Sequence, residues 1–201
     1  MNVILFLTME KWIISLIIGY ALGSIPFSYI LVRLVEGFDL RTKGSGNLGT
    51  TNVLRTLGFG YAVLNYVLDM LKGAVSFLII RAIFGTPMDL VAGLGAIFGH
   101  CFSPFVDFKG GKGVAVASGL LLASDARMFL VLVVVQFVML FITRRMSAGS
   151  ITSAACAPII AWFFNGKTPI FYAILLAGAF VIFQHRANIS RLLRGEEKPL
   201  F

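Results

Sequence analysis

The chain has 201 residues, of which 58% are hydrophobic and only 13% are charged, and its formal net charge is +8. Soluble domains carry about a quarter charged residues, so this balance excludes a water-soluble fold and predicts an all-α integral membrane protein. Each crossing needs about 20 apolar residues, so the length allows at most about seven or eight spans and predicts one membrane-integral domain, residues 1–201, with no separate soluble domain.

Apolar runs separated by short polar segments predict about seven transmembrane helices. In the first run Pro26 removes a helical hydrogen bond and predicts a kink. The N-terminus has no cleavable signal pattern, so the first span is its own insertion signal, and residues 1–8 are predicted to be a dispensable extension. The runs cover approximately residues 11–34, 58–84, 89–105, 114–124 (short for a crossing), 128–143, 150–164 and 168–184.

Two of these spans carry features that predict how they pack. Asp69 and Lys72 lie three residues apart inside the second apolar run. Ionisable groups are expensive in lipid, so we expect the two side chains to pair with each other. Gly95 and Gly99 in the third run form a small-xxx-small pair, which is suited to close helix packing.

The distribution of Lys and Arg predicts the orientation. If the loop after the first span is inside, twelve of these residues lie on the inner side and four on the outer side. We therefore predict an external N-terminus and a cytoplasmic C-terminus. The inner set is Arg33, Arg41, Lys43, Arg55, Lys109, Lys112, Arg144, Arg145, Arg186, Arg191, Arg194 and Lys198, and the outer set is Lys11, Arg81, Arg127 and Lys167.

The first inner loop, residues 41–55, combines glycines, hydroxyls, amides and cations, which together can bind an anion. Thr51 or Asn52 is expected to cap a helix that runs through Arg55 into the second span. The alternative is an ordinary solvated loop with a helix cap. The candidate ligand-binding residues here are Lys43, Ser45, Gly46, Asn47, Thr51, Asn52 and Arg55.

The segment from Gly99 to Ala115 places two lysines among three glycines just before an apolar run. Glycines let a turn fold tightly, and ammonium groups near the start of a helix favour a phosphate. The spacing does not match a P-loop, and the alternative is a flexible basic turn. His100 is either a base or a packing histidine. The candidates in this segment are His100, Lys109, Gly110, Gly111, Lys112 and Gly113.

Two later inner segments carry further polar groups. Ser147 and Ser150 stand beside two arginines and could reach a ligand, while His185 and Asn188 share a helix face at a spacing of three. The alternative for residues 185–194 is an interfacial amphipathic helix whose arginines contact anionic lipid.

Several classes of function are excluded by what the motifs lack. The sequence shows no His-x4-Asp pair, no nucleophile elbow, and no metal-ligand cluster, so we expect no metal and no cofactor. A nucleic-acid partner is not expected either. What remains is a site of cations, amides, hydroxyls and histidines that binds phosphates. The alternatives are a small transporter or flippase of a phosphorylated metabolite, or a transferase with a nucleotide-activated donor, whose acidic metal ligands are missing.

From about Gly23 onward the chain resembles the bacterial PlsY family of membrane-integral acyl-phosphate:glycerol-3-phosphate acyltransferases. Thr50 stands where the family usually has Ala, and Cys101 where a polar residue is common. The resemblance rests on five stretches, which are Gly23-Ser-Ile-Pro-Phe27, Gly44-Ser-Gly-Asn47 with Thr51-Asn-Val-Leu-Arg55, Gly99-His100 with Ser103-Pro-Phe105, Phe108-Lys-Gly-Gly-Lys-Gly-Val-Ala115, and His185-Arg186 with Asn188-Ile189.

The resemblance implies transfer of a fatty acyl group from acyl phosphate to the sn-1 hydroxyl of glycerol 3-phosphate, giving lysophosphatidic acid and phosphate. This is the first acylation step of phospholipid synthesis in the bacterial inner membrane, without acyl-CoA or acyl carrier protein. On this interpretation Lys112 and the glycine turn hold one phosphate, and the first loop holds the other. His185 and Asn188 orient the attacking hydroxyl, His185 or a substrate phosphate oxygen takes the proton, and Ser150 lies within reach of the substrate.

Overall fold

The computed structural model describes residues 3–201, and for residues 3–8 only the backbone, so the predicted extension, residues 1–8, lies largely outside the description. Every regular element within residues 3–201 is helical. The elements are α1 (Val3–Gly23), α2 (Phe27–Glu36), η1 (Leu40–Thr42), α3 (Thr50–Leu57), α4 (Phe59–Phe84), α5 (Met88–Cys101), η2 (Pro104–Val106), α6 (Val114–Ser124), α7 (Ala126–Thr143), α8 (Met146–Asn165), α9 (Pro169–Gln184) and α10 (Arg186–Leu193).

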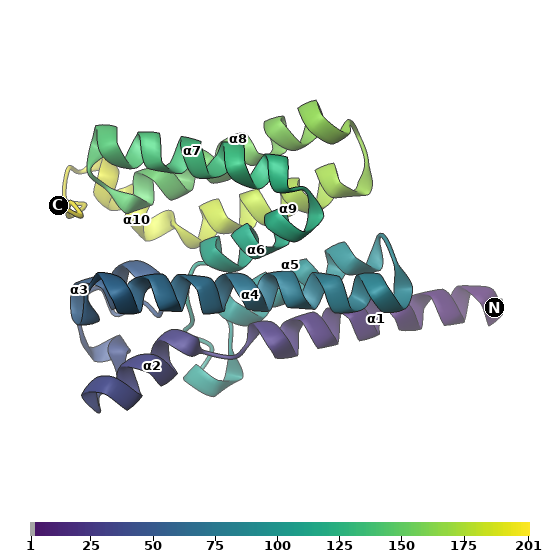
Figure 1. Cartoon of the computed structure of the whole chain (residues 1–201), viewed down its shortest axis with the longest axis horizontal. Helices are drawn as coiled ribbons and strands as arrows, with labels where there is room; N and C mark the ends of the chain where they lie inside the picture. Colours follow the sequence, from purple (N-terminus) through teal and green to yellow (C-terminus); the bar gives the residue numbers. More distant parts are fainter. Residues whose placement is uncertain (1–2) are drawn as a thin grey trace. The chain divides into compact units, whose positions relative to one another are not determined.

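The chain forms two compact units, which Figure 1 shows in purple to teal and in green to yellow. Unit 1 is Met1–Ala123 and contains α1 to α5 and most of α6. Unit 2 is Ser124–Phe201 and contains α7 to α10. That the chain is one functional domain stays a prediction.

Unit 1 is built on the close packing of α1, α4 and α5. A Cβ at Gly23 of α1 would lie 2.1 Å from the Ala96 carbonyl oxygen of α5, and one at Gly99 of α5 would lie 2.3 Å from the Tyr20 carbonyl oxygen of α1. No larger residue fits where the two backbones approach this closely. The expected close packing at Gly95 and Gly99 is confirmed, since Gly95 meets the Leu16 carbonyl in the same interface.

The first predicted span is two helices rather than one kinked helix. α1 ends at Gly23 and α2 begins at Phe27, because Pro26 has no N–H to donate and restricts the conformation of the residue before it. The break leaves the Ile25 carbonyl without a helical partner, and the Lys72 ammonium of α4 donates to it at 2.8 Å.

The expected helix cap in the first loop is wrong. α3 begins at Thr50 with Gly49 in the capping position and no side-chain cap, so Thr51 and Asn52 both lie inside the helix. Asn52 instead turns its side chain back into the preceding loop. α3 also stops at Leu57 rather than running on, because Gly58 adopts a φ of 85° and starts a new helix, α4.

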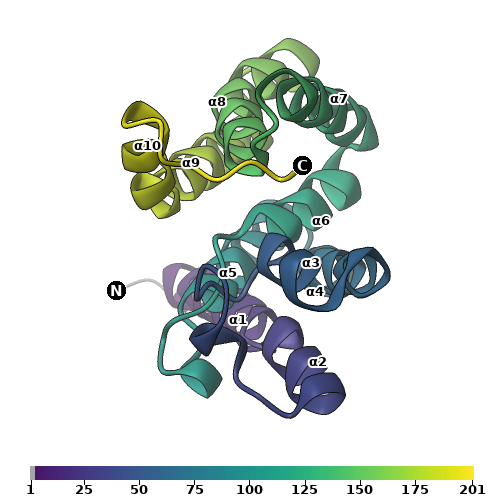
Figure 2. The same cartoon turned by 90° about the vertical axis from the view of Figure 1, so that its left-hand side faces the viewer.

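In unit 2, α8 lies between α7 and α9. The segment after α10 runs back to the turn that precedes α8. The Leu200 amide donates to the Arg144 carbonyl at the α7–α8 turn, at 2.7 Å. Figure 2 shows this segment in yellow, passing the ends of α9 and α8. The returning segment therefore ties the last helix to the turn that precedes α8.

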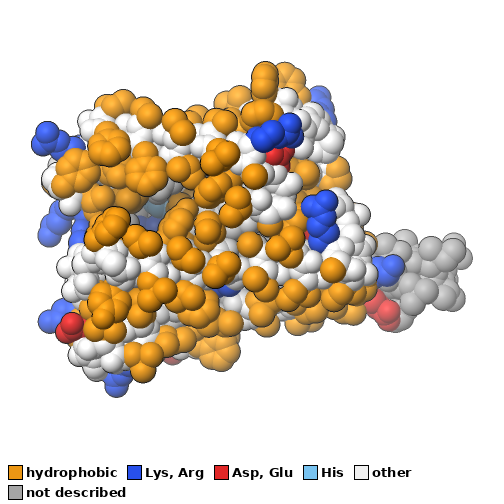
Figure 3. Space-filling model, in the orientation of Figure 1, with side chains coloured by type: hydrophobic (Ala, Val, Ile, Leu, Met, Phe, Trp, Pro, Cys, Tyr) orange, Lys and Arg blue, Asp and Glu red, His pale blue; other side chains and the backbone are white. Residues whose placement is uncertain are grey.

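The helices have the surface of a membrane protein. Apolar side chains cover most of α4 and α7 in Figure 3, while Lys and Arg gather near helix ends. Among the residues that the structure describes, four stretches are long and apolar enough to cross a bilayer, and the bent pair α9–α10, angled at 58°, makes up to five. The predicted number of about seven spans and their orientation stay predictions. The four stretches are Met9–Glu36, Met88–Val106, Ala126–Thr143 and Met146–Asn165.

Candidate functional site

The polar loop of unit 1, residues 43–49, is shaped by Asn52. The Asn52 Oδ1 atom accepts from the Ser45 amide at 3.1 Å, and its Nδ2 donates to the Lys43 carbonyl at 3.1 Å. Gly44 and Gly46 have φ values of 60° and 68°, which favour glycine, so the loop turns sharply twice. Asn52 is buried and holds the loop, while Lys43, Ser45, Gly46 and Arg55 are exposed and Asn47 and Thr51 are half-buried.

The turn that carries Lys109 and Lys112 is attached to the end of α5. The Gly110 amide donates to the Cys101 carbonyl at 3.0 Å, and the Gly111 amide donates to the His100 carbonyl at 3.2 Å. Both amides therefore already have acceptors within the chain. Glycine at position 110 lets the turn lie close to the end of α5, because a Cβ there would lie 1.9 Å from the His100 carbonyl oxygen.

The polar loop and the lysine–glycine turn lie side by side in unit 1. Asn47 Nδ2 donates to the Gly110 carbonyl at 3.3 Å, and a Cβ at Gly111 would lie 2.9 Å from the Leu48 carbonyl oxygen. Arg41 adds a second tie, because its Nη1 donates to the Val106 carbonyl at 3.0 Å. The two segments, more than sixty residues apart in sequence for the Asn47–Gly110 contact, thus form one basic surface rich in glycine, amide and hydroxyl groups.

His100 and the predicted pair in α4 lie directly beneath the turn. Asp69 Oδ1 is 2.8 Å from the Lys72 ammonium, which confirms the expected pairing, and 3.5 Å from His100 Nδ1. The other ring nitrogen of His100 faces Gly111, where a Cβ would lie 2.1 Å from Nε2. His100 is only 7% exposed and is therefore a buried link between α4 and the turn.

In unit 2 the Glu197 carboxylate holds three side chains, a contact that the sequence reasoning missed. Ser147 Oγ and Asn188 Nδ2 both donate to Oε1 at 2.7 Å, and Arg191 Nε donates to Oε2 at 2.6 Å. Arg145 Nε adds a bond to the Glu197 backbone carbonyl at 2.9 Å. We call this arrangement the Glu197 clasp. Its sequence signal is a pair of acidic residues, Glu196 and Glu197, in an otherwise basic segment.

His185 marks the bend between α9 and α10. Its Nδ1 lies 2.7 Å from the Val181 carbonyl oxygen, which can only accept, so Nδ1 carries the hydrogen. In the neutral ring the lone pair is then on Nε2, the state that a general base needs. Asn188 follows on α10 and is fixed by Glu197, while Ser150 is buried on α8 one turn after Ser147.

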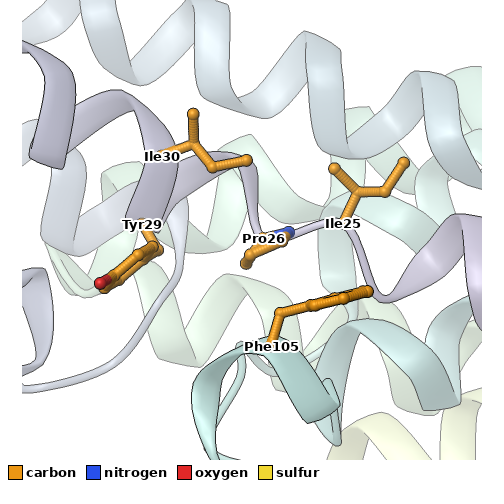
Figure 4. A pocket seen from close by; sticks show the side chains of 5 residues that line it. All are labelled: Ile25, Pro26, Tyr29, Ile30 and Phe105. Atoms are coloured by element: carbon orange, nitrogen blue, oxygen red, sulfur yellow. The ribbon is translucent and has the colours of Figure 1, made fainter.

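An apolar recess of about 360 Å³ opens in unit 1 at the break between α1 and α2. Figure 4 shows its lining, with the ring of Phe105 below the break and the side chains of Ile25 and Ile30 beside it. Pro26 and Tyr29 complete the lining. The recess can hold hydrocarbon next to the segment that leads into the lysine–glycine turn.

The chain is similar to known proteins over most of its length. Residues 13–195 match the family model described as glycerol-3-phosphate acyltransferase. The chain belongs to this family. Among curated relatives, the glycerol-3-phosphate acyltransferase of Erythrobacter litoralis is 44% identical over 184 residues, covering 92% of each chain, and glycerol-3-phosphate acyltransferase 2 of Moorella thermoacetica is 39% identical over 189 residues, covering 94% of this chain and 97% of its own.

Two solved structures of a glycerol-3-phosphate acyltransferase, the integral membrane protein PlsY (YgiH), share the fold. The glycerol 3-phosphate form has a TM-score of 0.88 at 37% identity, and the lysophosphatidic acid form has a TM-score of 0.85 at 35% identity. Each comparison covers 94% of both chains. This member of the acyltransferase family is therefore an all-helical integral membrane protein. Within residues 3–201 no three His, Cys, Asp or Glu side chains lie close enough to hold a metal ion.

The Glu197 clasp gives this acyltransferase family member a carboxylate with a shifted pKa. Burial raises the pKa of the Glu197 carboxyl, but the hydrogen bonds from Ser147, Asn188 and Arg191 together lower this pKa by more than burial raises it. The net pKa lies below the ordinary value of 4.5. A carboxyl with a lowered folded-state pKa contributes stability that is present above the unfolded pKa and lost as the pH falls through the folded pKa.

We expect Glu197→Gln to lower the melting temperature at pH 7 and to lower it much less in acid. The difference between wild type and variant should shrink as the pH falls from above 4.5 through the lowered folded-state pKa. Thermal unfolding of both proteins in detergent, measured from neutral pH downward, checks this expectation. Glu196→Gln is the matched control, because the Glu196 side chain is 56% exposed and pairs only at the surface with Arg194. A difference that stays constant across the pH range would contradict the role of the ionised clasp.

Proposed function

We propose that this chain transfers a fatty acyl group from acyl phosphate to the sn-1 hydroxyl of glycerol 3-phosphate, giving lysophosphatidic acid and inorganic phosphate. Membership of the glycerol-3-phosphate acyltransferase family supports the acceptor. The observation that carries the proposal is the contact between the polar loop and the lysine–glycine turn, since it gathers cations around groups suited to phosphate. Both proposed substrates carry a phosphate.

The chemistry needs no covalent acyl-enzyme. An acyl phosphate is a mixed anhydride, so the sn-1 oxygen can attack the acyl carbonyl carbon directly. The new carbon–oxygen ester bond forms, the carbonyl carbon–phosphate oxygen bond breaks with its electron pair, and phosphate leaves. The hydroxyl proton passes to His185 Nε2 or to a phosphate oxygen of a substrate. Positioning and charge stabilisation supply most of the rate enhancement.

The proposed phosphate ligands of unit 1 are cations and polar groups of the two segments. Lys112, with Lys109 and Gly113 in the same turn, binds one phosphate, and Lys43, Ser45, Asn47 and Arg55 bind the other. The tightly bonded Gly110 and Gly111, together with Asn52 and His100, give the two segments their shape.

Residues of unit 2 are proposed to orient and deprotonate the attacking hydroxyl of glycerol 3-phosphate. His185 is held in the tautomer that accepts a proton, and Asn188 is held by Glu197. Asn188 and Ser150 orient the glycerol hydroxyls. Variants in each unit test whether both sets of residues act in one reaction.

The lipid tail and the location follow from the apolar surface. The recess at the α1–α2 break supports binding of the first part of an acyl chain. We propose that the protein is a multi-pass protein of the bacterial cytoplasmic membrane, embedded in membrane lipid, and that the donor is acyl phosphate rather than acyl-CoA or acyl carrier protein. The cations and glycines of the two segments suit single phosphate groups, and the leaving group of acyl phosphate is inorganic phosphate, which is smaller than CoA or acyl carrier protein.

The test uses purified full-length protein with palmitoyl phosphate and radiolabelled glycerol 3-phosphate, in the presence of a chelator and without CoA. We expect labelled lysophosphatidic acid and an equal amount of inorganic phosphate. Parallel reactions replace palmitoyl phosphate with palmitoyl-CoA or palmitoyl-acyl carrier protein, and these should give no product. Product only from one of these thioesters would overturn the proposed donor, and uptake of glycerol 3-phosphate into proteoliposomes without acylation would indicate a transporter instead.

A further inference from the structure

The buried ionic cluster between α4 and α5 has no role in the chemistry described so far. Asn65, Asp69 and Lys72 of α4 and His100 of α5 are all at most 7% exposed. Burying charges away from water is costly, and a buried ion pair is often no more stabilising than apolar residues of similar size. Packing alone therefore does not account for this cluster.

Each member of the cluster reaches a different segment near the proposed phosphate-binding surface. Lys72 donates to the Ile25 carbonyl at the α1–α2 break, at 2.8 Å. Asn65 Nδ2 donates to Asp69 Oδ2 at 3.1 Å and also to Thr50 Oγ1, the first residue of α3, at 3.1 Å. The cluster thus joins the end of the polar loop and the α1–α2 break to the middle of α4.

The third connection runs through His100 to the lysine–glycine turn. Asp69 Oδ1 lies between the Lys72 ammonium and His100 Nδ1, at 2.8 Å and 3.5 Å. On its other side, the His100 ring fills the space against Gly111, and the His100 carbonyl accepts the Gly111 amide at 3.2 Å. The orientation of this ring therefore determines where the turn can lie.

We propose that Asp69 is a positioning residue which, through Lys72, Asn65 and His100, fixes the polar loop, the α1–α2 break and the lysine–glycine turn relative to one another. This inference rests on the proposed function for its kinetic consequence. Asp69 touches no substrate. It is the one carboxylate on which the three connections of unit 1 described above meet, so its charge sets the spacing of the two phosphate-binding segments.

The deciding variant is Asp69→Leu/Lys72→Met, which removes both charges together and keeps helix-forming residues of similar size. We expect its melting temperature to stay within about 3 °C of wild type. The kcat/KM should fall by about tenfold or more, mainly through a higher KM for glycerol 3-phosphate or acyl phosphate, because misplaced phosphate ligands bind less well. Asp69→Asn/Lys72→Gln retains hydrogen-bonding groups at both positions and should recover part of this loss.

A second measurement does not depend on catalysis. Trypsin cleaves after lysine, so a turn released from His100 should be cut after Lys109 or Lys112 about tenfold faster than in wild type, because local opening governs cleavage. Mass spectrometry of the fragments identifies the site. If the wild type were inactive, the proposed function would fail while this readout would still test the positioning role.

The matched control is Thr86→Val/Asp89→Leu at the other end of α5, where Thr86 Oγ1 donates to the buried Asp89 at 2.7 Å. It removes a buried carboxylate that also accepts from the Leu90 amide in the first turn of α5, so we expect a lower melting temperature with both KM values and the cleavage rate in the turn unchanged. Three results would overturn the proposal: unchanged KM values in Asp69→Leu/Lys72→Met, a parallel fall of melting temperature and specific activity at constant KM, or failure of this variant to fold while Asp69→Asn/Lys72→Gln shows normal KM values and cleavage. Each would make the cluster irrelevant to the loops or purely structural.

Discussion

Lys112→Ala is expected to lower the rate of acyl transfer at least about a hundredfold while the protein stays folded. Lys112 stands next to two glycines whose amides are bonded to the end of α5, so its backbone is held in place before any substrate arrives. An ammonium group placed beside the departing phosphate stabilises the negative charge that develops on it. Initial rates with palmitoyl phosphate and labelled glycerol 3-phosphate, together with thermal unfolding, measure both parts of the expectation.

Lys167→Ala is the matched control for loss of one lysine charge. Lys167 is exposed in the turn between α8 and α9, so its removal should leave the rate within about twofold of wild type. Lys112→Arg keeps the charge but changes its geometry and should recover only part of the activity. Near-normal turnover in folded Lys112→Ala would show that this lysine does not bind the reacting phosphate.

Gly110→Ala is expected to reduce kcat/KM by about thirtyfold or more and to lower the melting temperature. The added Cβ would lie 1.9 Å from the His100 carbonyl oxygen and 2.9 Å from the Cys101 carbonyl oxygen. Both are backbone atoms at the end of α5, so relief of the clash requires the lysine–glycine turn to move away from the helix. Steady-state kinetics with each substrate varied in turn, and thermal unfolding in detergent, check the effect.

Gly60→Ala provides the control for a glycine-to-alanine change. Nothing lies within 4 Å of a Cβ built at Gly60, which is in the first turn of α4, so alanine should preserve activity and slightly raise stability through helix propensity. If Gly110→Ala retained wild-type kinetics, the turn would not need its close contact with α5.

The sequence patterns that depend on local chemistry predicted the structure well. Alternation of apolar runs and polar segments located the long helices, and the small-residue spacing at Gly95 and Gly99 predicted close helix packing, which the structure shows against α1. The pairing of Asp69 and Lys72 followed from the cost of burying a charge in lipid. Each of these predictions needs only neighbours along one helix.

The predictions that failed or were missing depend on contacts that the sequence does not encode locally. Asn is a residue type that often caps helices, yet the Asn52 side chain donates to the Lys43 carbonyl of the preceding loop, and Gly49 takes the capping position. Glu197 accepts a hydrogen bond from Ser147, which lies fifty residues earlier in the sequence, and no periodic pattern predicts such a contact. The α1–α2 break was expected as a kink, because the sequence did not show that Lys72 would replace the lost helical donor at Ile25.

The position of Glu197 in the chain also bears on how unit 2 is made. Its carboxylate fastens α8 to α10, yet it follows both helices in the order of translation. Ser147 and Asn188 are therefore both synthesised before their shared acceptor. The hydrogen-bonded loops of unit 1 need only residues before α7, so they can form during synthesis, whereas α10 can be secured only after elongation has passed Glu197. A chain truncated after Gly195 should accordingly have a folded unit 1 and an unfastened α10.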